Sequence, residues 1–180
     1  DMNKGERMGC LKMDFLGLKN LDIMTNSIRL IYKRKGISID LSNLPFEDVV
    51  FKEIFAKGNT GCVFQFESGG MKQMLVKFGP ESFEDIILLV ASYRPGPMQY
   101  IPDMIEIKHK RKKAEYIIPQ LEDILGKTYG QCIYQEQLMD IFHKCAGFSL
   151  GKADLIRRFM SKKKEELFLK EKEPFLEGII

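Results

Sequence analysis

Arginine and lysine side chains cluster between residues 157 and 164. Arg157 and Arg158 are adjacent, and Lys162, Lys163 and Lys164 follow within a few residues. Guanidinium forks and ammonium groups bind phosphate oxygens through charge-assisted hydrogen bonds. The segment therefore predicts a site for a triphosphate or a nucleic-acid backbone, and the alternative is a solvated helix face.

Helical spacing would place the two arginines on one side of a helix. At 100° per residue, Arg157 and Arg158 share a side with Asp154 and Ser161. The opposite, apolar side holds Ala153, Ile156, Phe159 and Met160. We expect Ser149 to cap this helix and a break near Ser161 to leave the lysines within reach of the same ligand.

A second candidate is the segment Tyr93-Arg94-Pro95-Gly96-Pro97. The two prolines fix the backbone around the glycine and must end any preceding helix. Tyr93 and Arg94 would then lie together at a helix end, where a stacking ring beside a guanidinium can hold a base or a phosphate. The alternative is a rigid turn that only redirects the chain.

A third candidate is Asp14, a single carboxylate in the alternating segment from Cys10 to Leu16, two residues after Lys12. Alternation over so few residues is typical of a short β-strand. A carboxylate at a strand end can serve as a metal ligand, as in polymerase active sites, or can simply point to solvent.

Composition limits the classes of protein to which the chain can belong. Its 180 residues are 44% hydrophobic and 29% charged, typical of a soluble globular protein. No apolar run approaches the roughly 20 residues that span a bilayer, so we predict no membrane association. The four cysteines lack the spacing of a zinc or redox motif, which indicates reduced thiols and a cytoplasmic location.

The positive charge is concentrated in one part of the chain. Residues 108–164 contain 13 Lys and Arg against 6 Asp and Glu, a local charge of +7, although the whole chain carries only +3. Such a cluster can bind phosphate if the fold gathers it on one face.

Periodicity and capping signals predict mostly helices. We expect a helix from about Leu18 to Gly36, a short helix after Leu44-Pro45, and a brief extended piece at Val63–Phe66. Further helices are predicted at residues 71–78, 82–93, 98–109, 119–125, 135–146 and 150–160, with Ser82 as the N-cap of the second of these. The predicted fold class is mainly α, formally α+β because of the N-terminal strand, which we expect to pair with strands outside this chain.

Several ordered segments together resemble one protein family. They are Lys12 to Leu18, Gly58 to Ser68, Tyr93 to Pro97, Tyr129-Gly130, Tyr134 to Gln137, and Arg157 to Lys164. This set resembles the α subunit of bacterial DNA polymerase III, the C-family replicative polymerase, from about Leu11 to Lys164. The Arg-Pro-Gly-Pro segment resembles the more widespread form of that subunit rather than the long form with a built-in exonuclease.

The resemblance implies two domains and a role for each site residue. Residues 1–19 would be the C-terminal strand of the palm domain, and residues 20–180 part of the fingers. Asp14 would be the third catalytic carboxylate and a metal ligand, and Lys12 a lysine beside the active site. Arg157 and Arg158 would bind the triphosphate of the incoming nucleotide, with Phe159 and Ser161 replacing the usual alanine and glycine of that motif.

The resemblance also implies cofactors and partners. Two Mg²⁺ ions would serve the complete enzyme, and they need carboxylates of an upstream Pro-Asp-x-Asp motif that this chain does not contain. We therefore expect the isolated chain to be inactive. The implied partners are primer–template DNA, deoxynucleoside triphosphates and, through other regions, the sliding clamp and replisome subunits. The alternative is a stand-alone helical nucleic-acid-binding module.

Overall fold

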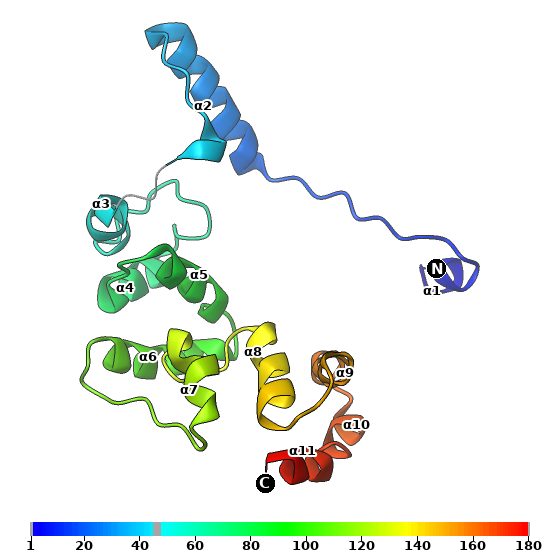
Figure 1. Cartoon of the computed structure of the whole chain (residues 1–180). Coiled ribbons are helices and arrows are strands. Elements are labelled where there is room, and N and C mark those ends of the chain that lie inside the picture. Colours follow the sequence, from blue (N-terminus) through cyan, green and yellow to red (C-terminus); the bar gives the residue numbers. More distant parts are fainter. Residues whose placement is uncertain (1, 45–47, 180) are drawn as a thin grey trace. The chain divides into compact units, whose positions relative to one another are not determined.

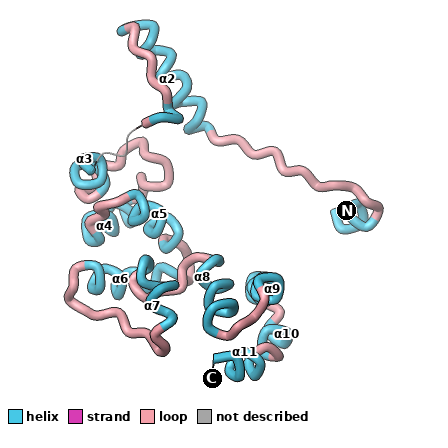
Figure 2. Tube along the Cα trace, viewed as in Figure 1, coloured by secondary structure: helices cyan, strands magenta, loops and turns pink. Residues whose placement is uncertain are grey.

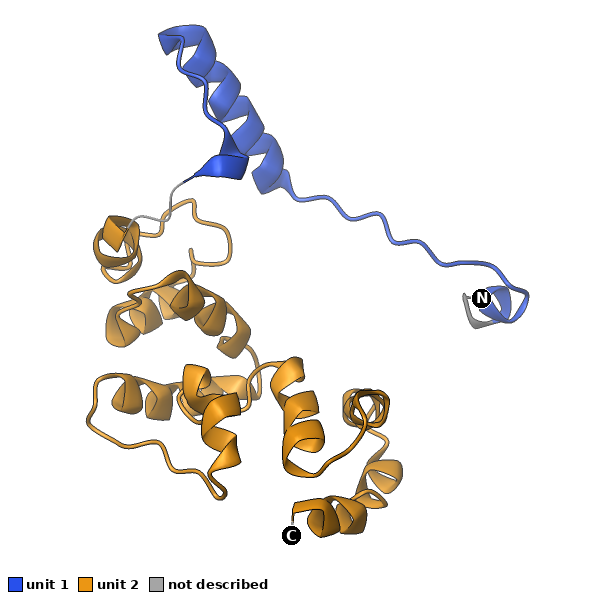
Figure 3. Ribbon diagram, in the orientation of Figure 1, with its two compact units in different colours: residues 1–45 blue, residues 46–180 orange. Residues whose placement is uncertain are grey.

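The computed structural model describes residues 2–44 and 48–179, and these residues form helices joined by loops and turns (Figure 1). The chain divides into two compact units, residues 1–45 and residues 46–180 (Figure 3). This division differs from the predicted palm and fingers boundary after residue 19, which stays a prediction. No helix among the described residues is long and apolar enough to cross a bilayer.

The first unit contains α1 (Met2–Arg7), α2 (Lys19–Lys35) and the 3₁₀ turn η1 (Leu41–Asn43). The predicted end of α2 is confirmed, because Gly36 adopts a left-handed φ of 69° and donates its N–H to the Tyr32 carbonyl over 2.8 Å. α2 buries none of its residues.

The strand predicted from Cys10 to Leu16 does not form, and residues 2–44 and 48–179 contain no strand (Figure 2). The segment that joins α1 to α2 is a loop in which Phe15 and Leu16 are more than nine-tenths exposed. A strand requires a hydrogen-bonded neighbour, and no described part of this chain supplies one. The alternation of apolar residues is present, but the partner strand is not.

The second unit is a series of short helices. They are α3 (Asp48–Val50), η2 (Phe51–Phe55), α4 (Gly69–Phe78), α5 (Phe83–Ser92), η3 (Pro97–Tyr100), α6 (Ile101–Lys108), α7 (Gln120–Leu125), η4 (Gly126–Thr128), α8 (Gln135–Asp140), η5 (Ile141–Cys145), α9 (Leu150–Ser161), α10 (Glu165–Leu169) and α11 (Lys172–Ile179). Two of them, η2 and η5, are π-helical turns that extend α3 and α8. The mainly helical prediction is therefore confirmed.

Serine caps begin three of these helices. The hydroxyls of Ser68, Ser82 and Ser149 accept hydrogen bonds from backbone N–H groups three residues later, at the starts of α4, α5 and α9. Ser82 and Ser149 were both predicted as caps, and both predictions are confirmed.

The extended piece predicted at Val63–Phe66 is instead a pair of turns. Cys62 and Gln65 adopt left-handed φ values of 63° and 68°, which an extended strand excludes. The buried Thr60 hydroxyl donates to the Phe66 carbonyl over 2.6 Å and closes this loop. Burial of Phe66 against the core thus prevails over the local β-forming tendency of the segment.

Apolar side chains form separate clusters within the second unit. The largest joins η2, α4, α5 and α6 through Phe51, Phe66, Met71, Met74, Leu75, Phe78, Ile86, Leu88, Leu89, Ile101 and Met104. Another joins η5 and α9 through Phe142, Ala146, Phe148, Ala153 and Ile156, with Phe168 and Phe175 of α10 and α11 packed against it. This second cluster buries Ala153 and Ile156 of α9, whereas Met160, which was predicted on the same apolar side, is 44% exposed.

A buried ion pair lies between α5 and α6. Lys108 Nζ is 2.8 Å from Asp85 Oδ2, and both side chains are only 10% exposed. Asp85 also accepts a hydrogen bond from the Glu81 N–H over 2.9 Å and one from the Tyr129 hydroxyl over 3.3 Å. Burial by itself lowers the pKa of Lys108, but the hydrogen bond and negative charge of Asp85 raise it above its usual value.

Replacing Lys108 by Met should lower the free energy of unfolding by about 3 to 5 kcal/mol, because it leaves Asp85 buried without its counter-charge. Chemical denaturation measures this loss. Lys112→Met is the matched control, since Lys112 pairs with Asp103 at a half-exposed site and should cost less than about 1 kcal/mol. Equal losses in the two variants would contradict the role given to the buried pair.

The same ion pair predicts that the free energy of unfolding depends on pH in the alkaline range. The pKa of Lys108 is raised in the folded chain, and that of Tyr129 is raised by burial and by the charge of Asp85. Their contribution to stability is therefore present at pH values below their pKa in the unfolded chain, which is about 10, and is lost as the pH rises through their pKa in the folded chain. Above about pH 10, the stability of Lys108→Met should fall less steeply than that of the wild type.

Candidate nucleotide and DNA interface

Arg157 is held on the polar side of α9 by a carboxylate one turn earlier. Its Nε and Nη2 atoms donate to Asp154 Oδ1 over 2.9 and 2.7 Å. Its Nη1 atom donates to Gln135 Oε1 of α8 over 2.7 Å. The guanidinium is thus fixed by two helices, and its side chain is only 23% exposed.

Arg158 shares the same carboxylate but is more accessible. Its Nε atom is 2.9 Å from Asp154 Oδ2, and its side chain is 62% exposed. The hydrogen bonds from Arg157, together with the charge of Arg158, hold the pKa of Asp154 below its usual range. Asp154 therefore stays ionised at neutral pH and anchors both guanidinium groups.

The anchored arginines keep donors for a further ligand. A guanidinium has five N–H groups, and Arg157 uses three of them on Asp154 and Gln135. Among the described residues, one N–H on each Nη atom remains without a partner and can donate to a phosphate oxygen. Arg158 contacts Asp154 through Nε, and its two Nη groups have no partner within residues 2–44 and 48–179.

A buried amide positions the N-terminal end of α8, and with it Gln135. Gln137 Oε1 accepts hydrogen bonds from the N–H groups of Ile133 and Tyr134, each over 2.9 Å. Its Nε2 atom donates to the Ile124 carbonyl and to the Thr128 hydroxyl over 3.0 and 2.7 Å. One side chain thus joins α7, η4 and the start of α8.

The predicted break at the end of α9 is confirmed. α9 ends at Ser161, and Lys163 adopts a left-handed φ of 53°. Lys162 and Lys163 are exposed and form no ion pair with a carboxylate of residues 2–44 or 48–179. They therefore follow directly after the arginine site, on a chain segment that has left the helix.

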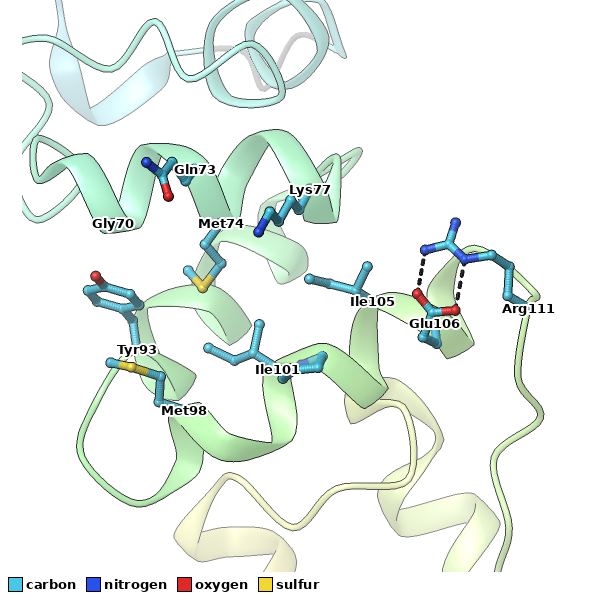
Figure 4. A pocket seen from close by; sticks show the side chains of 11 residues that line it. Gly70, Gln73, Met74, Lys77, Tyr93, Met98, Ile101, Ile105, Glu106 and Arg111 are labelled. Carbon is cyan, nitrogen blue, oxygen red and sulfur yellow. Dashed lines mark hydrogen bonds and ion pairs between the residues drawn. The ribbon is translucent and has the colours of Figure 1, made fainter.

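Tyr93 lines a pocket of about 500 Å³ between α4, the turn after α5, and α6 (Figure 4). The predicted interruption at Arg94–Pro97 is confirmed, because α5 ends at Ser92 and Gly96 adopts a φ of 104°. A Cβ atom added at Gly70 would overlap the Tyr93 hydroxyl, so the glycine is what lets the ring lie over α4. Arg94 is exposed and is not among the residues that line the pocket.

Asp14 and Lys12 lie in the first unit, on the exposed loop before α2. Their Oδ1 and Nζ atoms are 3.4 Å apart, and both side chains are about half exposed or more. Within residues 2–44 and 48–179, no three His, Cys, Asp or Glu side chains lie close enough to hold a metal ion. The described residues therefore do not by themselves fit a two-metal site.

The structure adds two residues that the sequence prediction did not include among site residues. Gln135 contacts Arg157 across 22 positions of sequence, and Asp154 links the two arginines. The spacing of Asp154 from Arg157 and Arg158, three and four residues, is an available signal for helical ion pairs. No spacing rule identifies Gln135, because its contact depends on how α8 packs against α9.

Residues 20–180 match the family described as "Bacterial DNA polymerase III alpha subunit finger domain". The chain belongs to the bacterial DNA polymerase III alpha subunit family. It is 46% identical over 177 residues, 98% of its length, to the DNA polymerase III subunit alpha of Staphylococcus aureus strain COL. It is also 46% identical over 179 residues to that of Halalkalibacterium halodurans.

The chain corresponds to only a small part of each DNA polymerase III subunit alpha that it matches. The chain spans 17% of the length of the Staphylococcus aureus protein and 16% of that of Halalkalibacterium halodurans. The matched residues include α4, α9 and the segments that position Arg157, so the site lies inside the finger-domain match.

Replacing Gln137 by Leu should lower the free energy of unfolding by about 3 kcal/mol, because the N–H groups of Ile133 and Tyr134 would lose their acceptor. Denaturant titration measures this change. Gln120→Leu, the same substitution at the exposed start of α7, should change stability by less than about 0.5 kcal/mol. A Gln137→Leu chain as stable as Gln120→Leu would show that the amide does not organise this region.

Proposed function

We propose that this chain is part of the catalytic subunit of a replicative DNA polymerase and that its second unit helps to bind the incoming deoxynucleoside triphosphate. The observation that carries the proposal is the arginine pair on α9, which is fixed by Asp154 and Gln135 and still has unused donors. Membership of the polymerase III alpha family supplies the chemical context.

The proposed work of the arginines is orientational and electrostatic. Nucleotidyl transfer develops negative charge on the departing pyrophosphate, and donors already fixed in place stabilise that charge without reorganising during the reaction. Arg157 would act as a fixed fork, and Arg158, which is more exposed, would close onto the phosphates. Lys162 and Lys163 would add charge from the segment after α9, and Tyr93 and Arg94 would contact nucleotide or DNA.

We further propose that residues 1–19 belong to the palm of the complete subunit and residues 20–180 to its fingers. There the segment from Cys10 to Leu16 would gain the neighbouring strands that it lacks in this chain. Asp14 would then be a metal ligand next to Lys12. Two Mg²⁺ ions would supply the Lewis-acid chemistry of nucleotidyl transfer, and Asp14 would hold them only together with carboxylates from outside this chain.

The remaining features of the proposal concern the whole protein. Its substrates would be primer–template DNA and deoxynucleoside triphosphates in the cytoplasm, and the sliding clamp and replisome subunits would contact other regions. The isolated chain should extend no primer, because Asp14 alone cannot hold two ions.

In the full-length subunit, Arg157→Ala and Arg158→Ala should each lower the efficiency of nucleotide incorporation about tenfold or more, the loss of a charge-assisted hydrogen bond of about 1.5 to 3 kcal/mol. Lysine at either position should restore only part of it, since an ammonium group lacks the fork. Steady-state nucleotide titration measures both effects.

The exposed Arg29 of α2 provides the control, and Arg29→Ala should leave nucleotide efficiency unchanged. If the arginines bind the template backbone instead, their variants would weaken DNA binding and flatten its salt dependence while nucleotide affinity stays constant. That result would overturn the triphosphate assignment.

Asp14→Asn in the full-length subunit should lower kcat about a hundredfold or more, since the amide keeps the shape but removes the charge at the reaction centre. DNA affinity should change little. Asp22→Asn, which alters an exposed carboxylate of α2, should leave kcat unchanged. Primer-extension kinetics measure both variants, and an Asp14→Asn enzyme that turns over like Asp22→Asn would exclude a catalytic role for Asp14.

A further inference from the structure

Two hollows lie on either side of the exposed ridge of α4. The first is the pocket of about 500 Å³ that Tyr93 lines, and the second, of about 320 Å³, lies between α4 and the turn after η2. Gln73 and Lys77 of α4 line both of them. The two hollows therefore form one surface across α4, which we call the α4 surface.

Cationic side chains occur along the whole α4 surface. Lys57 and Lys72 line the second hollow, Lys77 lines both, and Arg111 lines the first. Lys57 pairs with Glu53, and Arg111 forms a double hydrogen bond with Glu106 over 2.9 and 2.7 Å (Figure 4). Lys72 and Lys77 have no carboxylate partner among residues 2–44 and 48–179.

The first hollow also offers apolar and aromatic surface. Its floor includes the buried side chains of Met74 and Ile101, and Met98 is 40% exposed beside it. Tyr93 lies at one end, toward Gly70, while Lys77 and Arg111 lie toward the other (Figure 4). The hollow therefore suits a ligand that combines a flat or apolar part with negative charge near Lys77.

A cationic loop continues the surface beyond the Arg111 end. Lys110, Arg111, Lys112 and Lys113 follow α6 and are all exposed. Arg111 and Lys112 are paired with Glu106 and Asp103, whereas Lys110 and Lys113 have no carboxylate partner in the described part of the chain. This run of four cationic residues therefore adjoins the pocket through Arg111.

We propose that the α4 surface binds single-stranded DNA, with phosphates at Lys72 and Lys77 and a base in the hollow that Tyr93 lines. Proteins hold single strands by this combination of a cationic groove and an aromatic platform. A duplex would not use the hollow, because its bases are stacked inside the helix. The inference rests on the proposed polymerase function, whose substrate is a primer–template with an unpaired template strand.

The test compares two primer–templates bound by the full-length subunit, one with a single unpaired template nucleotide and one with about 16. The wild type should bind the long-overhang DNA more tightly. Lys72→Gln/Lys77→Gln should remove most of that difference and make the salt dependence of long-overhang binding shallower by about 1.4 in log–log slope, or about 0.7 per lysine. Binding and extension of the short-overhang DNA should be unchanged.

Tyr93→Leu tests the base platform separately and should weaken binding of the long overhang about tenfold. The charge-matched control is Lys127→Gln/Lys170→Gln, which removes two exposed lysines away from the α4 surface and should preserve the overhang effect. Circular dichroism melting establishes that every variant is folded.

Three results would overturn the proposal. In one, the Lys72→Gln/Lys77→Gln and control variants behave alike. In another, the wild type extends both DNAs but binds them equally, so that the polymerase function stands and the α4 surface has no part in it. In the third, polyglutamate peptide binding depends on Lys72 and Lys77 while overhang binding does not, which would assign the surface to an acidic protein. If the wild type neither binds nor extends either DNA, the polymerase proposal itself fails, and this inference fails with it.

Discussion

The second unit depends on the buried contact between Asp85 and Lys108. It joins α5 to α6 inside the largest apolar cluster, and the Tyr129 hydroxyl adds the chain beyond α7 to the same carboxylate. A buried ion pair adds little net stability compared with apolar packing, but the loss of either partner is severe. The pair therefore fixes how α5 and α6 meet, and this in turn shapes the hollow beside α4 that Tyr93, at the end of α5, and Ile101, at the start of α6, both line.

Hydrogen bonds from polar side chains connect the helices between this ion pair and the arginine site. Gln137 connects α7 and η4 to the start of α8, and Gln135 in the first turn of α8 reaches Arg157 on α9. Asp154 then holds Arg157 and Arg158 from within α9 itself. Ala153 and Ile156 of α9 are buried in the cluster that contains Phe142 and Phe148, so a rotation that moved the arginines away from their present face would lose that packing.

The two units differ in how much of their apolar surface is buried. The second unit buries large aromatic and aliphatic side chains, whereas α2 buries none and the loop before it exposes Phe15 and Leu16 almost fully. A strand-like sequence of this kind can gain stability only from a neighbouring strand. The same argument applies to the carboxylate of Asp14, since a metal centre needs several ligands and the described residues gather no group of three around it.

The sequence alone determines several local features, because each depends on residues within one helical turn. They are the helical character of the chain, the serine caps at Ser82 and Ser149, the end of α2 at Gly36 and the break at Ser161. The family resemblance also follows from ordered local motifs.

Contacts between distant parts of the chain do not follow from the sequence. Gln135 contacts Arg157, and Tyr93 lies over Gly70, only because separate helices pack together. The turns at Val63–Phe66, and the loop around Asp14 that has no partner strand among the described residues, likewise depend on which segments the fold brings near. Local spacing determines which residues form a helix and which side they share, but the positions of charges on different helices depend on packing that only the tertiary structure decides.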